Sequence, residues 1–392
     1  MTEETFLDCP EYTQGLCRSC NLLPIAYENQ LLSKQFDLVN KLSSHIDTNT
    51  EILPPHSSNI KGFRYKAKMV VSGEVQRVIF GLQNEQGEGI DLTNCALYTK
   101  EIISSFAALK AFVLKVGLVP YNIPKKKGRL KYILITQTYS TNELMIRFVL
   151  NDEIKVERMK EHLAELFDAL PNLKVVSANI QPIHQAILEG EKEIVLTEEK
   201  ALREVLNEVP LYINPKSFFQ THPELAQKLY LQASQMAVAI KPQRVWDLFC
   251  GVGGFGLTIL NELKKENIKS HLNGIEIEPN AITSAMRTAK ELQLNDISFS
   301  ALDSTLFAEN ISKAELPDLL VVNPPRRGVG KSLIQMINLS KIPHVIYSSC
   351  NIDSLKEDLS LLPNYTIQII QLFDFFPHTK HFEVIVRLKH RD

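Results

Sequence analysis

The sequence has no long apolar run and no leader pattern at its start. No window approaches the roughly 18 consecutive apolar residues that a membrane-spanning helix needs. Residues 1–10 carry Glu3, Glu4 and Asp8 where a secretory signal peptide would have positive charge and then an apolar stretch. We therefore expect a cytoplasmic protein without a membrane partner.

The sequence also lacks a large excess of charge of either sign. Its 43 Lys and Arg residues and 45 Asp and Glu residues give a formal net charge of −2, which argues against a protein that coats nucleic acid through bulk electrostatics. The average hides an asymmetry, because residues 61–131 contain 13 basic and only 5 acidic side chains. This basic middle segment indicates a polyanionic partner.

Internal repeats and low-complexity tracts are absent as well. With 44% hydrophobic and 22% charged residues, the composition excludes wholesale disorder and a coiled coil. A chain of 392 residues is long enough for two or three domains, each with its own core.

Three segments follow one another along the chain. Residues 1–55 combine a cysteine-rich start with a predicted helix over 27–45, which could pack on the C-terminal domain. Residues 56–210 predict a smaller α+β central domain, with strands at 69–72, 132–138, 144–150, 173–180 and 193–196 and helices at 101–116 and 152–170.

Strands and helices alternate in residues 211–392, which predicts an α/β domain with a Rossmann-like, doubly wound sheet. The expected helices are 223–240, one directly after a glycine turn, and 281–294. The expected strands are 244–249, 271–277, 319–323, 345–348, 367–376 and 383–388.

A glycine-rich turn follows the first of these strands. Gly251, Gly253 and Gly256 satisfy the G-x-G-x-x-G pattern, and Glu276 lies 20 residues further on, at the end of the next strand. Glycines let the backbone turn tightly and approach a ligand, and a carboxylate at that place can accept ribose hydroxyls. The pattern predicts a nucleoside-containing cofactor, although a simple strand-to-helix turn would use the same glycines.

Two further carboxylates bear on which cofactor it is. Asp247 stands at the strand end just before the turn, where it would crowd a dinucleotide pyrophosphate but could pair with the amino group of a methionine moiety. Asp303 stands where it could meet an adenine edge or could equally be a solvated loop residue. Asp247 therefore favours S-adenosyl-L-methionine over NAD.

Polar and reactive side chains follow the later strands of the same domain. Asn323 precedes two prolines that fix the backbone at the carboxyl edge of the sheet, and Cys350 ends the next strand. Cys350 is either a buried core thiol or a nucleophile. Glu383 lies between apolar strands, where partial burial would raise its pKa toward that of a usable base, or it is a surface carboxylate.

Four cysteines at the beginning of the chain form a candidate metal site. The ligands would be Cys9, Cys17, Cys20 and Cys95. Cys17 and Cys20 form a close pair, Cys9 precedes them by a few residues, and Cys95 is distant in sequence. Such a set can hold tetrahedral zinc or an iron–sulfur cluster, and the spacing alone slightly favours zinc.

Two basic segments interleave cations with aromatic residues, as phosphate contact and base stacking would require. Most charge runs are solvated faces, but the local excess of positive charge favours RNA contact here. The candidate RNA-binding residues are Arg64, Lys66, Lys68, Lys125, Lys126, Lys127, Arg129 and Lys131.

Taken together, these motifs closely resemble the RNA (uracil-C5)-methyltransferases. The resemblance rests on Asn-Pro-Pro-Arg-Arg-Gly at 323–328, Val-Ile-Tyr-Ser-Ser-Cys-Asn at 345–351 and Phe-Asp-Phe-Phe-Pro-His-Thr-Lys-His-Phe-Glu at 373–383, and extends to 62–72 and 217–221. Two positions depart from the family pattern. Ser354 replaces a usual Thr, and Asn323 replaces an Asp found in much of the family, so this position cannot act as a base.

The resemblance implies a fold, a reaction and a set of roles. A class I methyltransferase domain would bind S-adenosyl-L-methionine, Cys350 would add to C6 of a uracil, and Glu383 would remove the C5 proton. The family roles assign the cofactor to Gln220, Phe249, Gly251, Glu276 and Asn323, with Asp303 at the adenine, and they shift the four cysteines from zinc to a [4Fe-4S] cluster. The branch most similar to this chain methylates uracil 747 of 23S ribosomal RNA and lacks the extra N-terminal OB-type domain of a sibling enzyme. We expect a monomer.

Several other functions compete with this prediction. An NAD-dependent oxidoreductase could use the same glycine turn but leaves Cys350 and Glu383 without a role. An adenine or glutamine N-methyltransferase typically has an aromatic residue after the two prolines, where this chain has Arg326. Methylation of another rRNA or tRNA uracil, and a non-catalytic iron–sulfur RNA-binding assembly factor, remain as alternatives.

Overall fold

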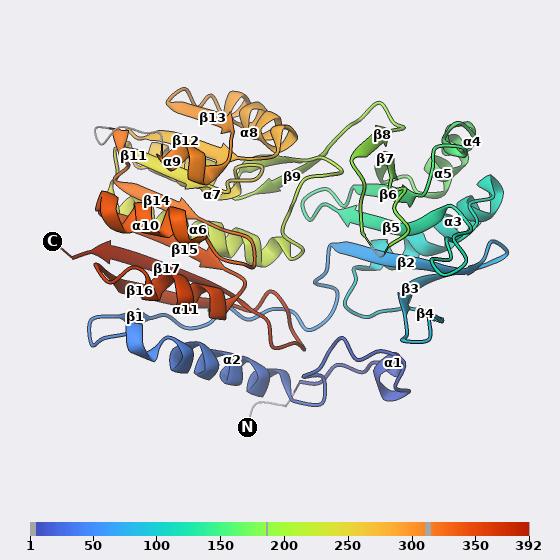
Figure 1. Ribbon diagram of the computed structural model, residues 1–392, viewed down its shortest axis with the longest axis horizontal. Coiled ribbons are helices and arrows are strands. Elements are labelled where there is room, and N and C mark those ends of the chain that lie inside the picture. Colours follow the sequence, from blue (N-terminus) through green and yellow to red (C-terminus); the bar gives the residue numbers. More distant parts are fainter. Residues whose placement is uncertain (1–4, 186, 310–314, 392) are drawn as a thin grey trace. The chain divides into compact units, whose positions relative to one another are not determined.

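The computed structural model describes residues 5–185, 187–309 and 315–391 and shows two compact units (Figure 1). The central unit comprises residues 7–19 and 59–204. The C-terminal unit comprises residues 20–58 and 205–391, together with residues 5–6. The chain therefore crosses between the units more than once.

The central unit is built on a seven-stranded sheet with the order β4-β3-β2-β5-β6-β7-β8. Neighbouring strands are antiparallel except for the parallel pair β6–β7. The strands are β2 (Lys66–Glu74), β3 (Arg77–Gln83), β4 (Gly89–Asp91), β5 (Leu130–Gln137), β6 (Leu144–Leu150), β7 (Leu173–Ile180) and β8 (Lys192–Val195), and the helices are α1 (Pro10–Thr13), α3 (Lys100–Val116), α4 (Val156–Glu161) and α5 (Leu163–Ala169).

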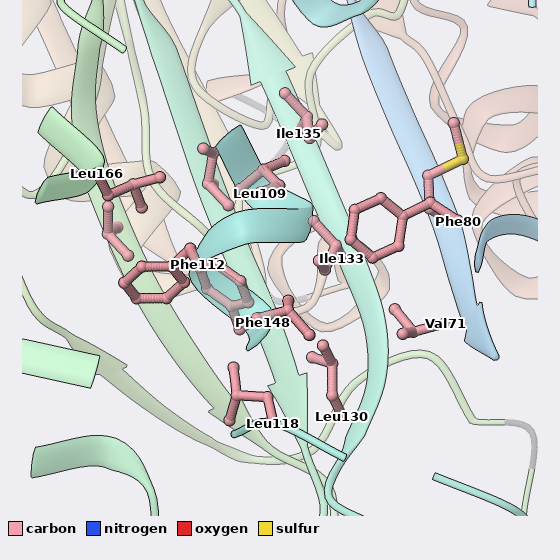
Figure 2. Packing of buried hydrophobic residues seen from close by; sticks show 14 of the residues in the cluster. Val71, Phe80, Leu109, Phe112, Leu118, Leu130, Ile133, Ile135, Phe148 and Leu166 are labelled. Carbon is pink, nitrogen blue, oxygen red and sulfur yellow. The ribbon is translucent and has the colours of Figure 1, made fainter. Parts of the chain in front are cut away.

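Helix α3 packs against this sheet and supplies much of its core. The Thr99 hydroxyl caps the helix by accepting a hydrogen bond from the Ile102 N–H, and Gly117 ends it with a φ of +72°. Figure 2 shows the buried cluster, in which the ring of Phe112 from α3 lies 5.4 Å from that of Phe148 on β6. Strand β2 alternates between buried and exposed positions, whereas β5, β6 and β7 in the middle of the sheet are buried along nearly their whole length.

The C-terminal unit contains an eight-stranded sheet with the order β1-β16-β17-β15-β14-β11-β12-β13. The strands are β1 (Glu51–Ile52), β11 (Arg244–Leu248), β12 (His271–Glu276), β13 (Ile297–Ala301), β14 (Leu319–Val322), β15 (His344–Ser349), β16 (Tyr365–Phe373) and β17 (Glu383–His390). All neighbours are parallel except β15–β17 and β16–β17. A two-stranded hairpin, β9 (Leu202–Leu206) and β10 (Val209–Ile213), precedes this sheet along the chain.

The strand order reverses direction between β11 and β14. Strand β11 lies between β12 and β14, so the chain continues first to one side and then to the other. In open α/β sheets, ligands bind at the carboxyl ends of the strands beside such a switch point. The connecting helices are α6 (Pro223–Ile240), α7 (Gly254–Lys265), α8 (Pro279–Glu291), α9 (Ser304–Glu309), α10 (Lys331–Ser340) and α11 (Ile352–Ser360).

The N-terminal helix belongs to the C-terminal unit. Helix α2 (Tyr27–Lys41), followed by the short 3-10 helix η1 (Ser43–His45), contributes Leu38 and Leu42 to the core of the large sheet and contacts α11 (Figure 1). The segment 1–55, which we expected as one N-terminal piece, is thus divided. Residues 7–19 join the central unit, and residues 20–58 join the C-terminal unit.

The strand and helix pattern expected from the sequence is largely present, with two kinds of difference. The single helix expected at 152–170 is two helices, because His162 interrupts it between α4 and α5. The elements that were not predicted are the strands β1, β3, β4, β9, β10 and β13 and the helices α1, α9, α10 and α11. In the part of the chain that the structure describes, no helix is long and apolar enough to cross a membrane.

Candidate active site

The turn between β11 and α7 has the conformation that its glycines predict. Gly251 and Gly253 have φ angles of +55° and +88°, and Phe249 also has a positive φ of +61°. A left-handed φ in a bulky residue costs roughly 1–3 kcal/mol and persists where the surrounding structure enforces it. The turn directs the N-terminus of α7 toward the carboxyl edge of the sheet, beside the switch point. This edge can therefore receive a nucleoside-containing ligand.

Two carboxylates hold the turn in place. Asp247 is fully buried, and its Oδ2 accepts a hydrogen bond of 2.8 Å from the Gly256 N–H. A Cβ on Gly256 would lie 2.7 Å from the same oxygen, so a larger residue there would require Asp247 or the turn to shift. Glu276, at the end of β12, accepts hydrogen bonds from the Gly251 N–H at 3.1 Å and from the Glu278 N–H at 3.0 Å.

Burial raises the pKa of Asp247 to about 7, because the charged form loses its hydration; the Gly256 N–H opposes this shift and the charge of Glu276 adds to it. Its Oδ1 has no hydrogen-bond partner among the described residues. An unpaired buried carboxylate oxygen is costly, and a cationic group placed against it would remove that cost. The ammonium group of a methionine moiety has the required charge.

The remaining predicted cofactor residues are Asn323, Gln220 and Asp303, which all lie in connecting segments of the C-terminal unit. Asn323 is half-buried directly after β14, and the half-buried Gln220 lies in the segment between β10 and α6. Asp303 is exposed, and its Oδ1 accepts hydrogen bonds from the backbone N–H groups of Thr305 and Leu306 at 2.9 and 3.1 Å. Asp303 thus caps α9, a structural use of its carboxylate that leaves the other oxygen, Oδ2, for a ligand.

Strands β15 and β17 bring the predicted nucleophile and base together. They are antiparallel neighbours in which Ser349 pairs with Val384, so that the next residue, Cys350, follows opposite Glu383. The Cys350 thiol is half-buried, whereas Glu383 is 3% exposed. The register of these two strands places the two residues opposite each other, and their roles stay predictions.

Glu383 has the properties of a buried acid. Burial raises its pKa to about 7, and a hydrogen bond that the Ser348 hydroxyl donates to Oε1 at 2.6 Å pulls the pKa down. Burial dominates, because the carboxyl group has lost nearly all contact with water. A carboxyl group with a pKa near neutrality can both accept and return a proton at physiological pH.

The surroundings of Cys350 act on its thiol in opposite directions. Burial and the charge of Glu383 raise the pKa of the thiol, and the cation of Arg326 lowers it. Arg326 lies in the loop after the two prolines, where its carbonyl accepts a hydrogen bond of 2.8 Å from the Asn351 side chain and its guanidinium lies 3.2 Å from His381. Among the neighbouring charges, the cation of Arg326 is the one that favours the thiolate form of Cys350.

Three residues near this site were missed by the sequence reasoning. Ser348 precedes Cys350 by two positions, so both side chains lie on the same face of β15. The ring of Tyr230 lies where a Cβ on Gly254 would be, and its pKa is raised by burial and by the charges of Asp247 and Glu383. Arg326 was noted only as a residue that is not aromatic. The β-strand period could have identified Ser348, but no local pattern marks Tyr230.

The four candidate ligand cysteines are distributed over both units. Cys9, Cys17 and Cys95 belong to the central unit, and the charges of Cys9 and Cys17 act on the Cys95 thiol, whose pKa is raised first of all by burial. Cys20 belongs to the C-terminal unit. Within 5–185, 187–309 and 315–391, no three His, Cys, Asp or Glu side chains are arranged to hold a metal ion.

The candidate RNA-binding residues divide into exposed and engaged ones. Lys68, Lys125, Lys126 and Lys127 are exposed. Lys131, in contrast, is 4% exposed and donates hydrogen bonds to the carbonyl oxygens of Gln181 at 2.7 Å and Ile183 at 2.6 Å. Its ammonium is committed to the fold, and we remove Lys131 from the candidate set.

The half-buried members of the set are Arg64, Lys66 and Arg129. Arg129 pairs with Asp152 at 3.4 Å, and the Arg64 guanidinium lies 5.9 Å from the centre of the Tyr98 ring. The pKa of Lys66 is lowered to about 8 by burial and by the neighbouring charges of Lys68 and Arg147. These positions stay predictions for RNA contact.

Comparison with known proteins identifies the relatives of this chain. Residues 26–391 match the family model described as tRNA (Uracil-5-)-methyltransferase. The 23S rRNA (uracil(747)-C(5))-methyltransferase RlmC of Actinobacillus pleuropneumoniae serotype 5b (strain L20) is 50% identical over 97% of this chain and 98% of its own length. The protein of the same name from Xenorhabdus bovienii (strain SS-2004) is 47% identical over 97% of this chain and 99% of its own length.

A solved structure shares the fold. The Pyrococcus abyssi tRNA (uracil-54, C5)-methyltransferase, in complex with S-adenosyl-L-homocysteine, superposes with a TM-score of 0.75, covers 94% of this chain and 85% of its own, and is 24% identical. That likeness supports the architecture. The family model and the curated relatives go further, and they show that this chain belongs to the tRNA (uracil-5-)-methyltransferase family.

Proposed function

We propose that the protein transfers a methyl group from S-adenosyl-L-methionine to C5 of uracil 747 in 23S ribosomal RNA, giving 5-methyluridine. The target comes from relatives that are 47–50% identical over nearly the whole chain and carry this activity in their names. The observation that carries the chemistry is that Cys350, directly after β15, follows opposite Glu383, the first residue of β17, in a sheet that also holds the glycine turn.

The chain offers a complete set of groups for the cofactor. Gly251 and Phe249 in the turn, Glu276 and Asp303 at the ends of β12 and β13, and Gln220 and Asn323 nearby would hold it. Glu276 is already oriented by two backbone N–H groups, which suits it to accept the ribose hydroxyls. When bound, S-adenosyl-L-methionine supplies an electrophilic methyl group on a sulfonium.

The thiolate of Cys350 starts the reaction by attacking C6 of the uracil. The new S–C6 bond turns C5 into an enolate-like carbon, which can form a bond to the methyl group while the sulfonium sulfur retains the electron pair of the broken bond. Glu383 then removes the proton from C5. The electrons of that C–H bond form the C5–C6 double bond, and the S–C6 bond breaks to return the thiolate of Cys350.

Protonation states in the site suit this sequence. Glu383, with its pKa of about 7, is a carboxylate in part of the population at neutral pH and can accept the C5 proton. Burial and the charge of Glu383 raise the pKa of the Cys350 thiol, and the cation of Arg326, which opposes this shift, is the group that favours the thiolate. A uracil between thiol and cofactor has to leave any base stack, so we expect a flipped base or a single-stranded loop.

RNA contact is assigned to the exposed and half-buried cations of the central unit. These are Arg64, Lys66, Lys68, Lys125, Lys126, Lys127 and Arg129. Neutralising phosphates with lysines makes binding salt-dependent, with a slope of about −0.7 per contact for single strands in a plot of log affinity against log salt concentration. Replacing Lys125, Lys126 and Lys127 by Gln should therefore weaken RNA binding and flatten this slope.

We infer that Cys9, Cys17, Cys20 and Cys95 bind a [4Fe-4S] cluster with a structural or RNA-docking role. Support comes from the cysteine spacing and from the mutual electrostatic influence of the three thiols in the central unit. Binding would remove the protons from the four thiols. Iron, sulfide and zinc analysis of protein purified without oxygen, beside Cys95→Ala, tests this: zinc in stoichiometric amount, or iron unaffected by Cys95→Ala, would overturn it.

The test of the proposed activity is methyl transfer from labelled S-adenosyl-L-methionine to unmethylated 23S RNA, with tRNA in parallel. Wild-type protein should label uracil 747, and Cys350→Ala should neither label RNA nor form a covalent complex. Glu383→Gln should transfer the methyl group but remain attached to the RNA. Label at another rRNA or tRNA uracil would replace the target, and full activity of Cys350→Ala would overturn the covalent mechanism.

Two further assignments accompany the proposed function. A protein that acts on ribosomal RNA would work in the cytoplasm, and all proposed catalytic groups come from one chain, which fits a monomer. Absence of any transfer to RNA by protein with intact metal content, and unchanged RNA binding by Cys350→Ala, would favour the non-catalytic assembly factor.

A further inference from the structure

The loop that connects β16 to β17 is fastened to the N-terminal helix by buried polar contacts. Lys34 of α2 is 2% exposed, and its Nζ donates a hydrogen bond of 2.6 Å to Asp374 Oδ1, which is itself fully buried. The same ammonium donates to the Phe376 carbonyl at 3.1 Å. One cation thus holds both the side chain at the start of the loop and the backbone two residues later.

A second residue of α2 holds the middle of the loop. The Gln30 side chain is 1% exposed, and its Oε1 accepts a hydrogen bond of 2.8 Å from the His378 N–H. Its Nε2 lies 3.3 Å from His378 Nδ1. On the other side of the same residue, the His378 carbonyl accepts a hydrogen bond of 2.9 Å from the N–H of Leu22.

His378 has a conformation that needs such support. Its φ of +65° lies in the left-handed region, which a residue with a Cβ rarely adopts without enforcement by its surroundings. Both backbone polar groups of His378 are bonded to the N-terminal segment. The contacts from Gln30 and Leu22 therefore select the loop conformation.

The loop ends at Glu383. Asp374 follows the last residue of β16, Glu383 is the first residue of β17, and Phe373 pairs with Glu383 across the two strands. His381 of the same loop lies against Arg326, the cation that acts on the Cys350 thiol. A change in the loop would thus move the carboxyl group and the cation beside the thiol.

We propose that Lys34 and Gln30 are positioning residues for catalysis, which hold the 374–382 loop so that Glu383 faces the C5 proton. This inference rests on the proposed role of Glu383 as the base. A buried ion pair is weak evidence for stability, since a well-packed apolar pair is often as stable. The ion pair instead orients the loop, because the Lys34 ammonium binds the Asp374 carboxylate and the Phe376 carbonyl at the same time.

The experiment uses the full chain with its metal content intact and compares Lys34→Met and Gln30→Leu with Lys41→Met. Lys41 is the matched control, because it lies on the same helix and pairs with Asp353 at 2.5 Å, but at an exposed site. We measure the affinity for S-adenosyl-L-methionine, kcat, and the fraction of protein covalently bound to RNA during turnover.

Loss of base positioning should slow the step that removes the C5 proton and releases the methylated RNA. It should leave the affinity for the cofactor nearly unchanged. We expect Lys34→Met and Gln30→Leu to keep cofactor affinity within about twofold, to lose about tenfold to a hundredfold in kcat, and to accumulate the covalent RNA complex, as Glu383→Gln does. Lys41→Met should behave as wild type. Unchanged kcat in both Lys34→Met and Gln30→Leu would overturn the proposal.

A variant that fails to fold is replaced by one that leaves no unpaired charge. Lys34→Met with Asp374→Leu removes both members of the buried pair, so its stability should recover while its kcat stays low; recovery of full kcat would overturn the proposal. Glu383→Gln separates the two hypotheses. If it turns over without accumulating the complex, the role of Glu383 as the base fails, and the positioning proposal fails with it.

Discussion

Replacing Glu383 by Gln should stabilise the protein in a way that depends on pH. The pKa of Glu383 is raised from 4.5 to about 7, so folding favours the protonated form. A raised pKa in an acid contributes stability that is fully present below pH 4.5 and is lost as pH rises through about 7. Glutamine keeps the acceptor oxygen for the Ser348 hydroxyl but has no charge to bury.

The magnitude follows from the size of the pKa shift. At about 1.4 kcal/mol per pKa unit, the shift from 4.5 to about 7 corresponds to about 3 kcal/mol of stability. Glu383→Gln should therefore be about 3 kcal/mol more stable than wild type at pH 8 and nearly equal to it at pH 4.5. At roughly 2 °C or more per kcal/mol, the melting temperatures should differ by at least about 5 °C at pH 8.

The assay is thermal or urea unfolding of both proteins between pH 4.5 and 8, in one buffer series of constant ionic strength. Cys350→Ala serves as a control from the same site that leaves the Glu383 carboxyl in place. A difference between wild type and Glu383→Gln that stays constant over the whole pH range would refute the assignment of a buried acid that folds in its neutral form. The difference should begin to grow above about pH 4.5 and level off above about pH 7, the two pKa values between which folding releases the proton from Glu383.

Three further predictions concern the same edge of the sheet. Ser348→Ala removes a hydrogen bond to the charged form of Glu383 that is worth about 1.5–3 kcal/mol, so the pKa of Glu383 should rise. The acid limb of the profile of kcat/KM against pH should then move up by about one to two pH units. An unmoved limb would contradict this prediction. Because the pKa of Asp247 is raised to about 7, cofactor affinity measured by calorimetry should increase between pH 6 and 8 in wild type and stay flat in Asp247→Asn. Gly256→Ala would place a Cβ 2.7 Å from Asp247 Oδ2 and should weaken cofactor binding by at least about tenfold, whereas normal binding would show that the turn can shift to admit the methyl group.

The parts of the site that the sequence predicts are those built from neighbours in the chain. The glycine turn, Glu276 at the next strand end and Cys350 at the end of β15 follow from periodicity and turn chemistry, which act over a few residues. The roles of Cys350 and Glu383 came from the family resemblance, whereas their opposite positions on two neighbouring strands follow from a register that the sequence did not predict.

The unpredicted parts depend on register and on packing between distant segments. The Ser348 hydroxyl reaches Glu383 because of the antiparallel register of β15 and β17. Tyr230 comes from α6, and its place beside Asp247 is set by the packing of α6 on α7. Lys34, in a segment that reads as an ordinary amphipathic helix, has its partner 340 residues further along the chain. No local pattern carries that information.

The position of α2 and β1 in the C-terminal unit has a consequence for folding. Strand β1 forms the edge of the large sheet by pairing with β16, and the buried ion pair of Lys34 forms only when Asp374 has been synthesised. Contacts between segments so far apart in sequence require closure of a long loop, which slows folding. During synthesis, helix α2 leaves the ribosome long before the strands that it covers exist. We therefore expect the large sheet to acquire its native stability late, when the first and last segments of the C-terminal unit meet.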